Sequence, residues 1–89
     1  MKKAMQEKMA ILEAKFPKAW FKDGGEFSSG HENTIWTGEG SFVYDPAYDF
    51  EVGIFKWDFT IHPMFESVLD DLGLWAEYYD GGTVFIYER

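Results

Sequence analysis

Glycine-rich turn signals divide this chain into short apolar pieces, and they restrict its fold more than any other feature. The signals are Asp23-Gly24-Gly25, Gly38-Glu39-Gly40 and Asp80-Gly81-Gly82. Each favours a tight reversal between neighbouring antiparallel strands. The pieces around the first two signals predict strands at residues 19–22, 26–28, 34–37 and 41–44. The third signal lies in the strongest hairpin pattern of the chain, with strands at residues 75–79 and 83–87.

Two other segments show the helical period of an amphipathic helix. Apolar residues recur with this period from Met5 to Phe16, and Pro17 disfavours helical geometry at the residue before it. We therefore predict a first helix over residues 3–15. Pro63 suits the first turn of a second helix, and Gly73 suits the residue just after its end.

Residues 50–61 alternate apolar and polar side chains, but the phase of the alternation changes beside Gly53. Because glycine tolerates the backbone angles of a β-bulge, we predict one long strand with a bulge at Gly53. The elements together predict a single α+β domain over residues 1–89, in which a twisted antiparallel sheet of about 4–6 strands packs against two helices. Since the chain has no cysteine, side-chain packing alone has to stabilise this domain.

The charges divide the chain at about residue 22. Residues 1–22 carry six lysines against two glutamates, a net charge of +4, whereas residues 23–89 carry fourteen carboxylates against Lys56 and Arg89, a net charge of −12. Nucleic acid is a poor ligand for the acidic part, because duplex binding needs a lysine- and arginine-rich face that neutralises phosphates. The charge distribution favours a basic protein surface as the partner.

The candidate partner-binding residues are acids from several predicted elements, together with one tyrosine. The acids are Asp45, Asp49, Glu51, Asp58, Glu66, Asp70, Asp71, Glu77 and Asp80. Asp70 and Asp71 lie at the carboxyl end of the second predicted helix, where the helix dipole disfavours negative charge. Tyr48 is the predicted interface anchor, because it stands among acids and tyrosine is enriched at interface hot spots. Most phenylalanine and tryptophan side chains are assigned to the core.

No combination of residues predicts a catalytic, cofactor or metal site. His31 and His62 are not spaced to converge with carboxylates on a metal ion, and residues 45–51 lack the glycine and closing glutamate of a calcium loop. Residues 38–41 lack the lysine of a phosphate-binding loop, and no serine stands in a nucleophile elbow. We therefore expect a protein that is not an enzyme and uses no cofactor.

Two stretches carry a resemblance to other proteins. They are residues 74–87 (LWAEYYDGGTVFIY) and residues 35–41 (IWTGEGS), about a quarter of the chain. Both resemble small uncharacterised proteins of phage and prophage genomes. The resemblance implies a mobile-element origin, where small acidic proteins often inhibit host nucleases, as anti-CRISPR and anti-restriction proteins do. It brings no known activity and assigns no role to any residue.

The leading hypothesis is a non-enzymatic inhibitor, encoded by a phage or mobile element, that uses its acidic surface to block a basic nucleic-acid-binding site on a host protein. The carboxylates would stand in for phosphates, which requires them to form one continuous patch. The simpler interpretation is a solvated acidic face that only confers solubility. No signal peptide or membrane span is predicted, so we expect a cytoplasmic protein, in the host cell cytoplasm if a phage encodes it.

Two forms of self-association remain as alternatives. The first is a small structural module that pairs through an exposed sheet edge and the aromatic hairpin, because free strand edges invite pairing. The second is a homodimer in which the basic first helix of one copy contacts the acidic part of another.

Overall fold

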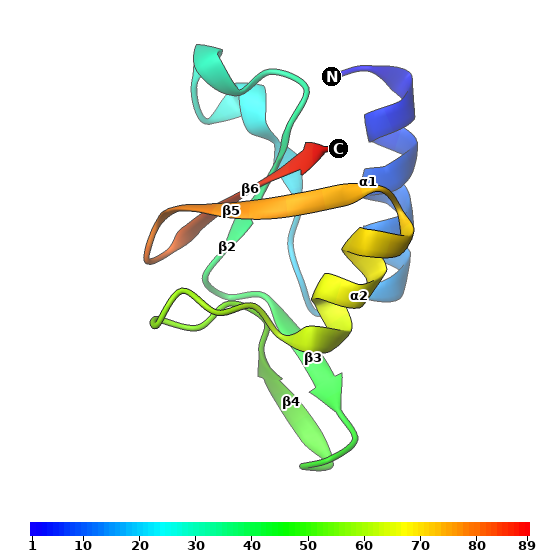
Figure 1. Ribbon diagram of the computed structural model, residues 1–89, viewed down its shortest axis with the longest axis vertical. Coiled ribbons are helices and arrows are strands. Elements are labelled where there is room, and N and C mark those ends of the chain that lie inside the picture. Colours follow the sequence, from blue (N-terminus) through cyan, green and yellow to red (C-terminus); the bar gives the residue numbers. More distant parts are fainter.

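Two helices pack on one face of a four-stranded antiparallel sheet, and a separate hairpin projects from one end of these layers (Figure 1). The computed structural model describes residues 1–89. In chain order the elements are α1 (Lys3–Lys15), β1 (Lys22–Asp23), the short 3₁₀ helices η1 (Gly24–Glu26) and η2 (Ser29–His31), β2 (Ile35–Gly38), β3 (Phe42–Asp45), β4 (Phe50–Gly53), α2 (Pro63–Asp71), β5 (Leu74–Asp80) and β6 (Thr83–Glu88). This arrangement confirms the predicted α+β class.

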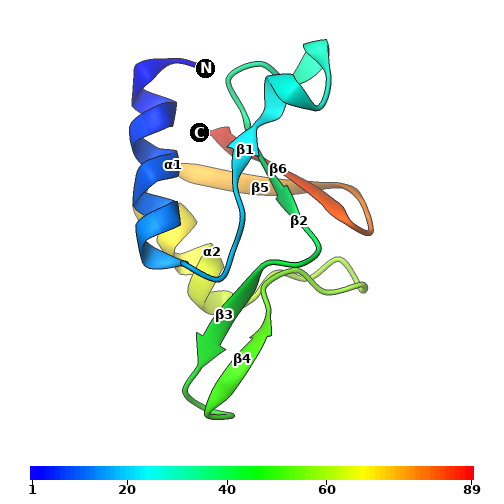
Figure 2. The same cartoon turned by 180° about the vertical axis from the view of Figure 1, so that it is seen from behind.

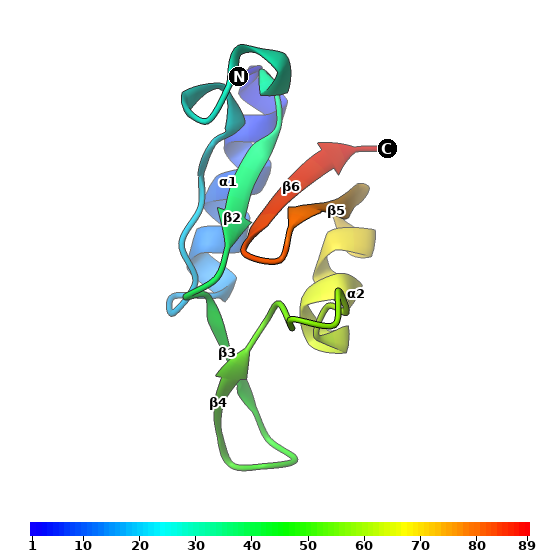
Figure 3. The same cartoon turned by 90° about the vertical axis from the view of Figure 1, so that its left-hand side faces the viewer.

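The four-stranded sheet has the order β1-β2-β6-β5, and all neighbouring strands are antiparallel. The predicted hairpin near the end of the chain is confirmed as β5–β6. Strand β6 lies between β5 and β2, so Ile86 pairs with Ala76 on one side and with Ile35 on the other. Strands β3 and β4 pair only with each other, and they lie beyond the end of the four-stranded sheet (Figures 2 and 3).

Both helices begin where the sequence predicts. The first helix covers Lys3–Lys15 and ends just before Phe16, which leaves helical geometry because Pro17 follows it. In the second helix, Pro63 occupies the first turn and the His62 side chain accepts a hydrogen bond from the Met64 N–H. Gly73 follows the helix with φ +70°, a left-handed conformation that glycine adopts without steric cost.

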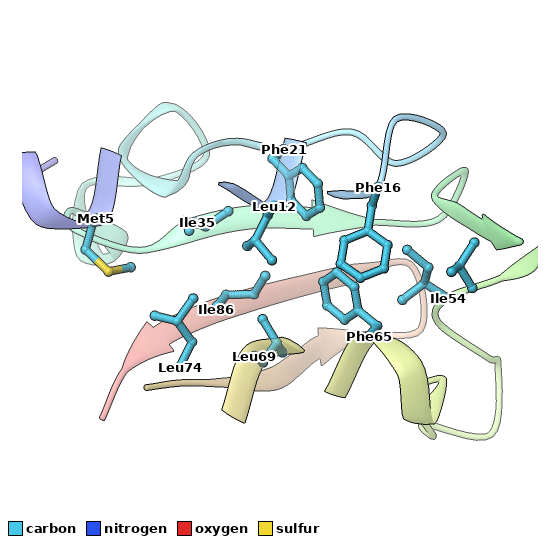
Figure 4. Close-up of a cluster of buried hydrophobic side chains, with 11 residues drawn as sticks. Met5, Leu12, Phe16, Phe21, Ile35, Ile54, Phe65, Leu69, Leu74 and Ile86 are labelled. Carbon is cyan, nitrogen blue, oxygen red and sulfur yellow. The ribbon is translucent and has the colours of Figure 1, made fainter. Parts of the chain in front are cut away.

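The hydrophobic core lies between the helices and the sheet, and aromatic rings fill its end nearest the hairpin (Figure 4). Phe65 of α2 is fully buried among three other rings. Its ring centroid is 4.9 Å from that of Phe16, 5.4 Å from that of Phe55 and 6.1 Å from that of Phe21. Because these residues come from four separate segments, this cluster holds both helices and two loops together.

The β3–β4 hairpin joins the same core through only part of its surface. Val43 of β3 and Ile54, just after β4, are buried in the core cluster. Phe42 and Tyr44, the neighbours of Val43 in β3, are exposed, as the alternation of side chains along a strand requires. The hairpin therefore has an inner face that contacts the core and an outer face that does not.

Two of the predicted strands near the start of the sheet are wrong. Only Lys22–Asp23 is a strand, and the residues predicted as a strand at 26–28 belong to η1 and the turn after it. The Asp23 carboxylate accepts a hydrogen bond from the Gly25 N–H at 2.9 Å and starts η1. This local side-chain bond offers the backbone an alternative to strand pairing.

The predicted long strand over residues 50–61 is also wrong, because β4 ends at Gly53. The chain then forms a loop at residues 56–60 that is closed by a single antiparallel bridge between Phe55 and Ile61. The phase change beside Gly53 thus marks the end of a strand and not a bulge within one. Of the apolar residues that follow, Phe55 packs against the core, whereas Trp57 lies exposed on the surface.

We expect Phe65→Ala to lower the free energy of unfolding by about 3–5 kcal/mol, because truncating a buried aromatic side chain loses its contacts and leaves a cavity. Urea denaturation followed by circular dichroism measures the change. Met64→Ala is the control, since Met64 is the exposed neighbour of Phe65 in α2 and the change should cost less than about 1 kcal/mol. Equal losses in the two variants would contradict the central role of the Phe65 cluster.

Candidate functional site

A groove with a volume of about 740 Å³ lies between the inner face of the β3–β4 hairpin and the chain that follows it. We call it the hairpin groove. Tyr48, Phe50 and Val52 line it from the hairpin, and Trp57 and His62 line it from the following segment. Because Phe50 and Val52 are two residues apart in β4, their side chains point to the same face of the hairpin. The groove is therefore bounded by two segments that are both fixed to the core.

Large aromatic side chains are exposed around the hairpin groove. Trp57 is 88% exposed, Tyr48 64%, Phe59 60% and Phe50 56%. The rings of Tyr48 and Phe50 lie 5.8 Å apart, so they present one continuous apolar surface on the hairpin side. Exposed apolar patches rimmed by polar groups are typical of protein interaction sites on soluble proteins.

Asp45 and His62 form a nearly buried ion pair or hydrogen bond at one end of the groove. The Asp45 Oδ2 and His62 Nε2 atoms are 2.8 Å apart. Because His62 Nδ1 accepts the Met64 N–H at 3.1 Å, the ring hydrogen of the neutral imidazole is assigned to Nε2, which donates to Asp45. This single imidazole therefore connects the end of β3 to the start of α2.

The environment of Asp45 favours its charged form. The hydrogen bond from His62 is the largest cause that lowers the pKa of the Asp45 carboxyl, and a hydrogen bond from the Ala47 N–H lowers it further. A carboxylate, and not a carboxylic acid, therefore stands at the end of the groove near neutral pH.

Tyr78 of β5 fixes the loop that carries Trp57. Its hydroxyl donates to the Thr60 carbonyl at 2.7 Å and accepts the Lys56 N–H at 3.1 Å. Burial is the largest cause that raises the pKa of Tyr78, so the hydroxyl stays a donor at neutral pH. The Phe59 ring packs edge-on against the Tyr78 ring at 5.1 Å. Both sides of the loop are thus attached to the four-stranded sheet.

Asp58 holds the same loop from within. Its carboxylate accepts hydrogen bonds from the Thr60 hydroxyl at 2.7 Å and from the Thr60 N–H at 3.2 Å. The bond from the hydroxyl is the largest cause that lowers the pKa of Asp58. Phe59 has φ +66°, an uncommon angle for a residue with a side chain. The internal bonds hold this turn and leave Trp57 pointing into solvent.

The structure brings three of the ten predicted partner-binding residues into the hairpin groove, namely Asp45, Tyr48 and Asp58. Glu51 pairs with Tyr44 across the hairpin and shares its outer face, where both line a separate hollow. Asp49 lies in the β3–β4 turn, and its carboxylate accepts a hydrogen bond from the Tyr44 hydroxyl. Two neighbouring acids of the prediction therefore lie outside the groove.

The other five predicted acids belong to different parts of the molecule. Glu66 and Asp70 line a smaller hollow beside β5, where Asp70 forms an ion pair with Arg89 at 2.7 Å. Asp80 accepts the Gly82 N–H in the β5–β6 turn. Asp71 and Glu77 line none of the three hollows of the surface. The predicted set does not meet in one groove, because its members come from the β3–β4 hairpin, the loop at residues 56–60, α2 and β5.

Several residues of the groove were missed by the sequence analysis, which counted Phe50 and Trp57 among the phenylalanine and tryptophan residues that for the most part fill the core. The charged neighbours of Trp57, Lys56 and Asp58, give no signal, because a buried residue of an alternating strand has polar neighbours as well. Tyr78 lies 22 residues from Lys56, and nothing in the local pattern connects them.

No protein-family model matches the chain, and comparisons with curated proteins and with solved structures give no match. No three histidine, aspartate or glutamate side chains are placed where they could hold a metal ion together. Neither α1 nor α2 is long and apolar enough to cross a membrane.

We expect the stability contributed by Asp45 to be present above its ordinary pKa of about 4 and to be lost as the pH falls through its lowered folded-state pKa. Asp45→Asn should therefore be less stable than the wild type at about pH 5, and this difference in the free energy of unfolding should shrink as the pH is lowered. Urea denaturation across this range measures the difference. Asp71→Asn is the control, since Asp71 makes no ion pair. The difference in free energy of unfolding between Asp71→Asn and the wild type should change less with pH.

We expect Tyr78→Phe to release the loop without unfolding the protein, because it keeps the ring but removes the hydroxyl that bonds Lys56 and Thr60. Losing roughly 1 kcal/mol of hydrogen bonding predicts amide hydrogen exchange at Lys56 that is roughly fivefold faster. Tyr79→Phe is the control, since the Tyr79 hydroxyl has no hydrogen-bond partner within the chain. Unchanged exchange at Lys56 in Tyr78→Phe would show that the loop does not depend on this hydroxyl.

Proposed function

We propose that this protein is a non-enzymatic binding protein that recognises a basic protein surface through the hairpin groove. The observation that carries the proposal is the exposure of Trp57, Tyr48 and Phe50 around one groove that also holds the carboxylates of Asp45 and Asp58. Tryptophan and tyrosine are the residues most enriched at interface hot spots. Free energy gained by burying these rings would supply affinity, and the carboxylates would select a basic partner.

The negative net charge of the residues around the hairpin groove favours a basic partner. Residues 45–62 carry Asp45, Asp49, Glu51 and Asp58 against Lys56, a net charge of −3 with histidine neutral. The surrounding part of the chain, residues 23–89, is also strongly acidic. A field of one sign accelerates association with an oppositely charged surface and makes it sensitive to salt.

Inhibition is the role that fits such a binder. A basic surface that attracts this groove is of the kind that also binds nucleic-acid phosphates. A protein bound there through Asp45, Asp58 and Trp57 would block that surface. We infer that this protein inhibits a nucleic-acid-binding protein. Its binding site would be the hairpin groove and its rim, a smaller surface than the ten residues predicted from the sequence.

We expect Trp57→Ala to weaken binding of a fluorescein-labelled peptide, in which lysine alternates with valine, by roughly tenfold or more. Fluorescence anisotropy at about 20 mM and about 300 mM salt measures the affinity, which has to fall as salt rises. Trp75→Ala is the matched control, because Trp75 is a half-exposed tryptophan of β5 outside the hairpin groove. Replacing lysine by glutamate in the peptide should abolish binding. Equal affinity of the wild type and Trp57→Ala would contradict the proposal.

Self-association is a second candidate, favoured by the position of β5 at the edge of the four-stranded sheet. Trp75 and Tyr79 of this strand are exposed. A free edge with apolar side chains can pair with the same edge of a second copy. Sedimentation at two protein concentrations tests this candidate, and a monomer at both concentrations counts against it.

A further inference from the structure

Strand β4 has an outer edge that pairs with no other strand. The β3–β4 sheet contains only these two strands, and no helix or strand lies beside β4 on its outer side in either of two opposite views (Figures 1 and 2). The Ile54 N–H donates to the Ser41 carbonyl at 3.0 Å, which fixes the phase of the ladder between the two strands. Since alternate residues of a strand direct their backbone groups to opposite sides, Glu51 and Gly53 direct theirs away from β3.

The backbone at this edge is open to another chain. A Cβ atom added to Gly53 would meet only the Phe55 carbonyl oxygen, at 3.7 Å. Glu51 is exposed. A glycine within a strand commonly stands where another backbone approaches closely. The loop and turn hydrogen bonds of the chain do not use the N–H or C=O groups of Glu51 and Gly53, so these outward groups can pair with an incoming strand.

The outer edges of β3 and β5 are less suited to pairing with an added strand. At β3, the Phe42 N–H is already bonded to the Lys18 carbonyl at 3.0 Å, and Lys15 and Lys18 lie beside that strand. At β5, the ladder is irregular between Tyr78 and Asp80, and the hairpin groove does not reach this strand. Strand β4 alone combines a free edge with the aromatic groove.

The two faces beside the β4 edge differ in chemistry. On the inner face, Phe50 and Val52 line the hairpin groove opposite Trp57. On the outer face, Glu51 is exposed and shares a hollow with Lys15 and Lys18. Lys18 lies at the far edge of β3, where its carbonyl accepts the Phe42 N–H, so Glu51 is the charged residue of this hollow that belongs to β4. Side chains of an added strand would also alternate between these two faces. The inner positions favour apolar side chains, and the outer positions next to Glu51 favour lysine or arginine.

We propose that an extended partner segment with alternating apolar and basic residues adds to β4 as a third strand of the hairpin sheet. This inference rests on the proposed function and adds Glu51, which lies outside the hairpin groove, to the carboxylates of Asp45 and Asp58 that attract a basic partner. Backbone hydrogen bonds to Glu51 and Gly53 fix the segment at the edge. Its apolar side chains enter the groove against Trp57, while its basic side chains approach Glu51. Strand addition of this kind draws affinity from the main chain and specificity from alternate side chains.

The test uses the lysine–valine peptide in two N-methylated forms, one methylated at every valine amide and the other at every lysine amide. In a strand the two sets of amides point to opposite edges. Strand addition predicts that one form loses affinity roughly tenfold or more, while the other stays within about threefold of the unmodified peptide. Equal affinities, or equal losses, of the two forms would overturn the inference.

Hydrogen exchange of the protein's own amides provides a second measurement that needs no variant. The bound peptide should slow exchange at Glu51 and Gly53 by roughly tenfold or more, and leave exchange at Tyr44, on the opposite strand, unchanged. Unchanged exchange at Glu51 and Gly53 in the saturated complex would also overturn the inference.

The outcomes separate this inference from the proposed function. If both methylated peptides bind like the unmodified one and Trp57→Ala still weakens binding, strand addition is wrong and recognition by the groove stands. If Trp57→Ala binds the peptide as tightly as the wild type, both are wrong. Gly53→Pro, which removes one outward N–H, should lose affinity for the peptide.

Discussion

The packing of aromatic rings around Phe65 is the interaction on which the other parts of the structure depend. Phe16 brings the end of α1 to this point, Phe21 brings the segment before β1, and Phe55 brings the start of the loop that carries Trp57. With no disulfide in the chain, apolar burial has to hold these segments in place. The hairpin and its groove are positioned only because Ile54 and Val43 extend the same cluster.

Around this core, polar side chains hold irregular backbone so that large rings can face solvent. The Tyr78 hydroxyl and the Asp58 carboxylate together satisfy the backbone at Lys56 and Thr60. His62 satisfies the first free N–H of α2 and binds Asp45 with its other nitrogen. A binding surface that is ordered before its partner arrives loses less conformational entropy on association. The groove therefore combines exposed apolar area with little remaining freedom.

The sequence was sufficient for the elements that depend on local signals. The helix ending at Lys15 follows from Pro17, the start of α2 follows from Pro63, and the β5–β6 hairpin follows from its glycine turn. Periodicity failed after Gly53 because it records which residues are apolar and not whether a second segment covers them. Trp57 and Phe55 have equal apolar character, yet only Phe55 meets the core. That difference arises because Phe55 packs against Phe65 of α2, a contact that the pattern within residues 50–61 does not contain.

The central position of β6 has a consequence for how the molecule is made. This strand joins β2 to β5, and without it the four-stranded sheet reduces to the two residue pairs between β1 and β2. During synthesis the four-stranded sheet can therefore form only once residues 83–88 have emerged from the ribosome. Until then Ile35 and Leu12 have no complete apolar layer to cover them. The order of the strands in space therefore makes most of the sheet depend on a segment that is synthesised after the other three strands.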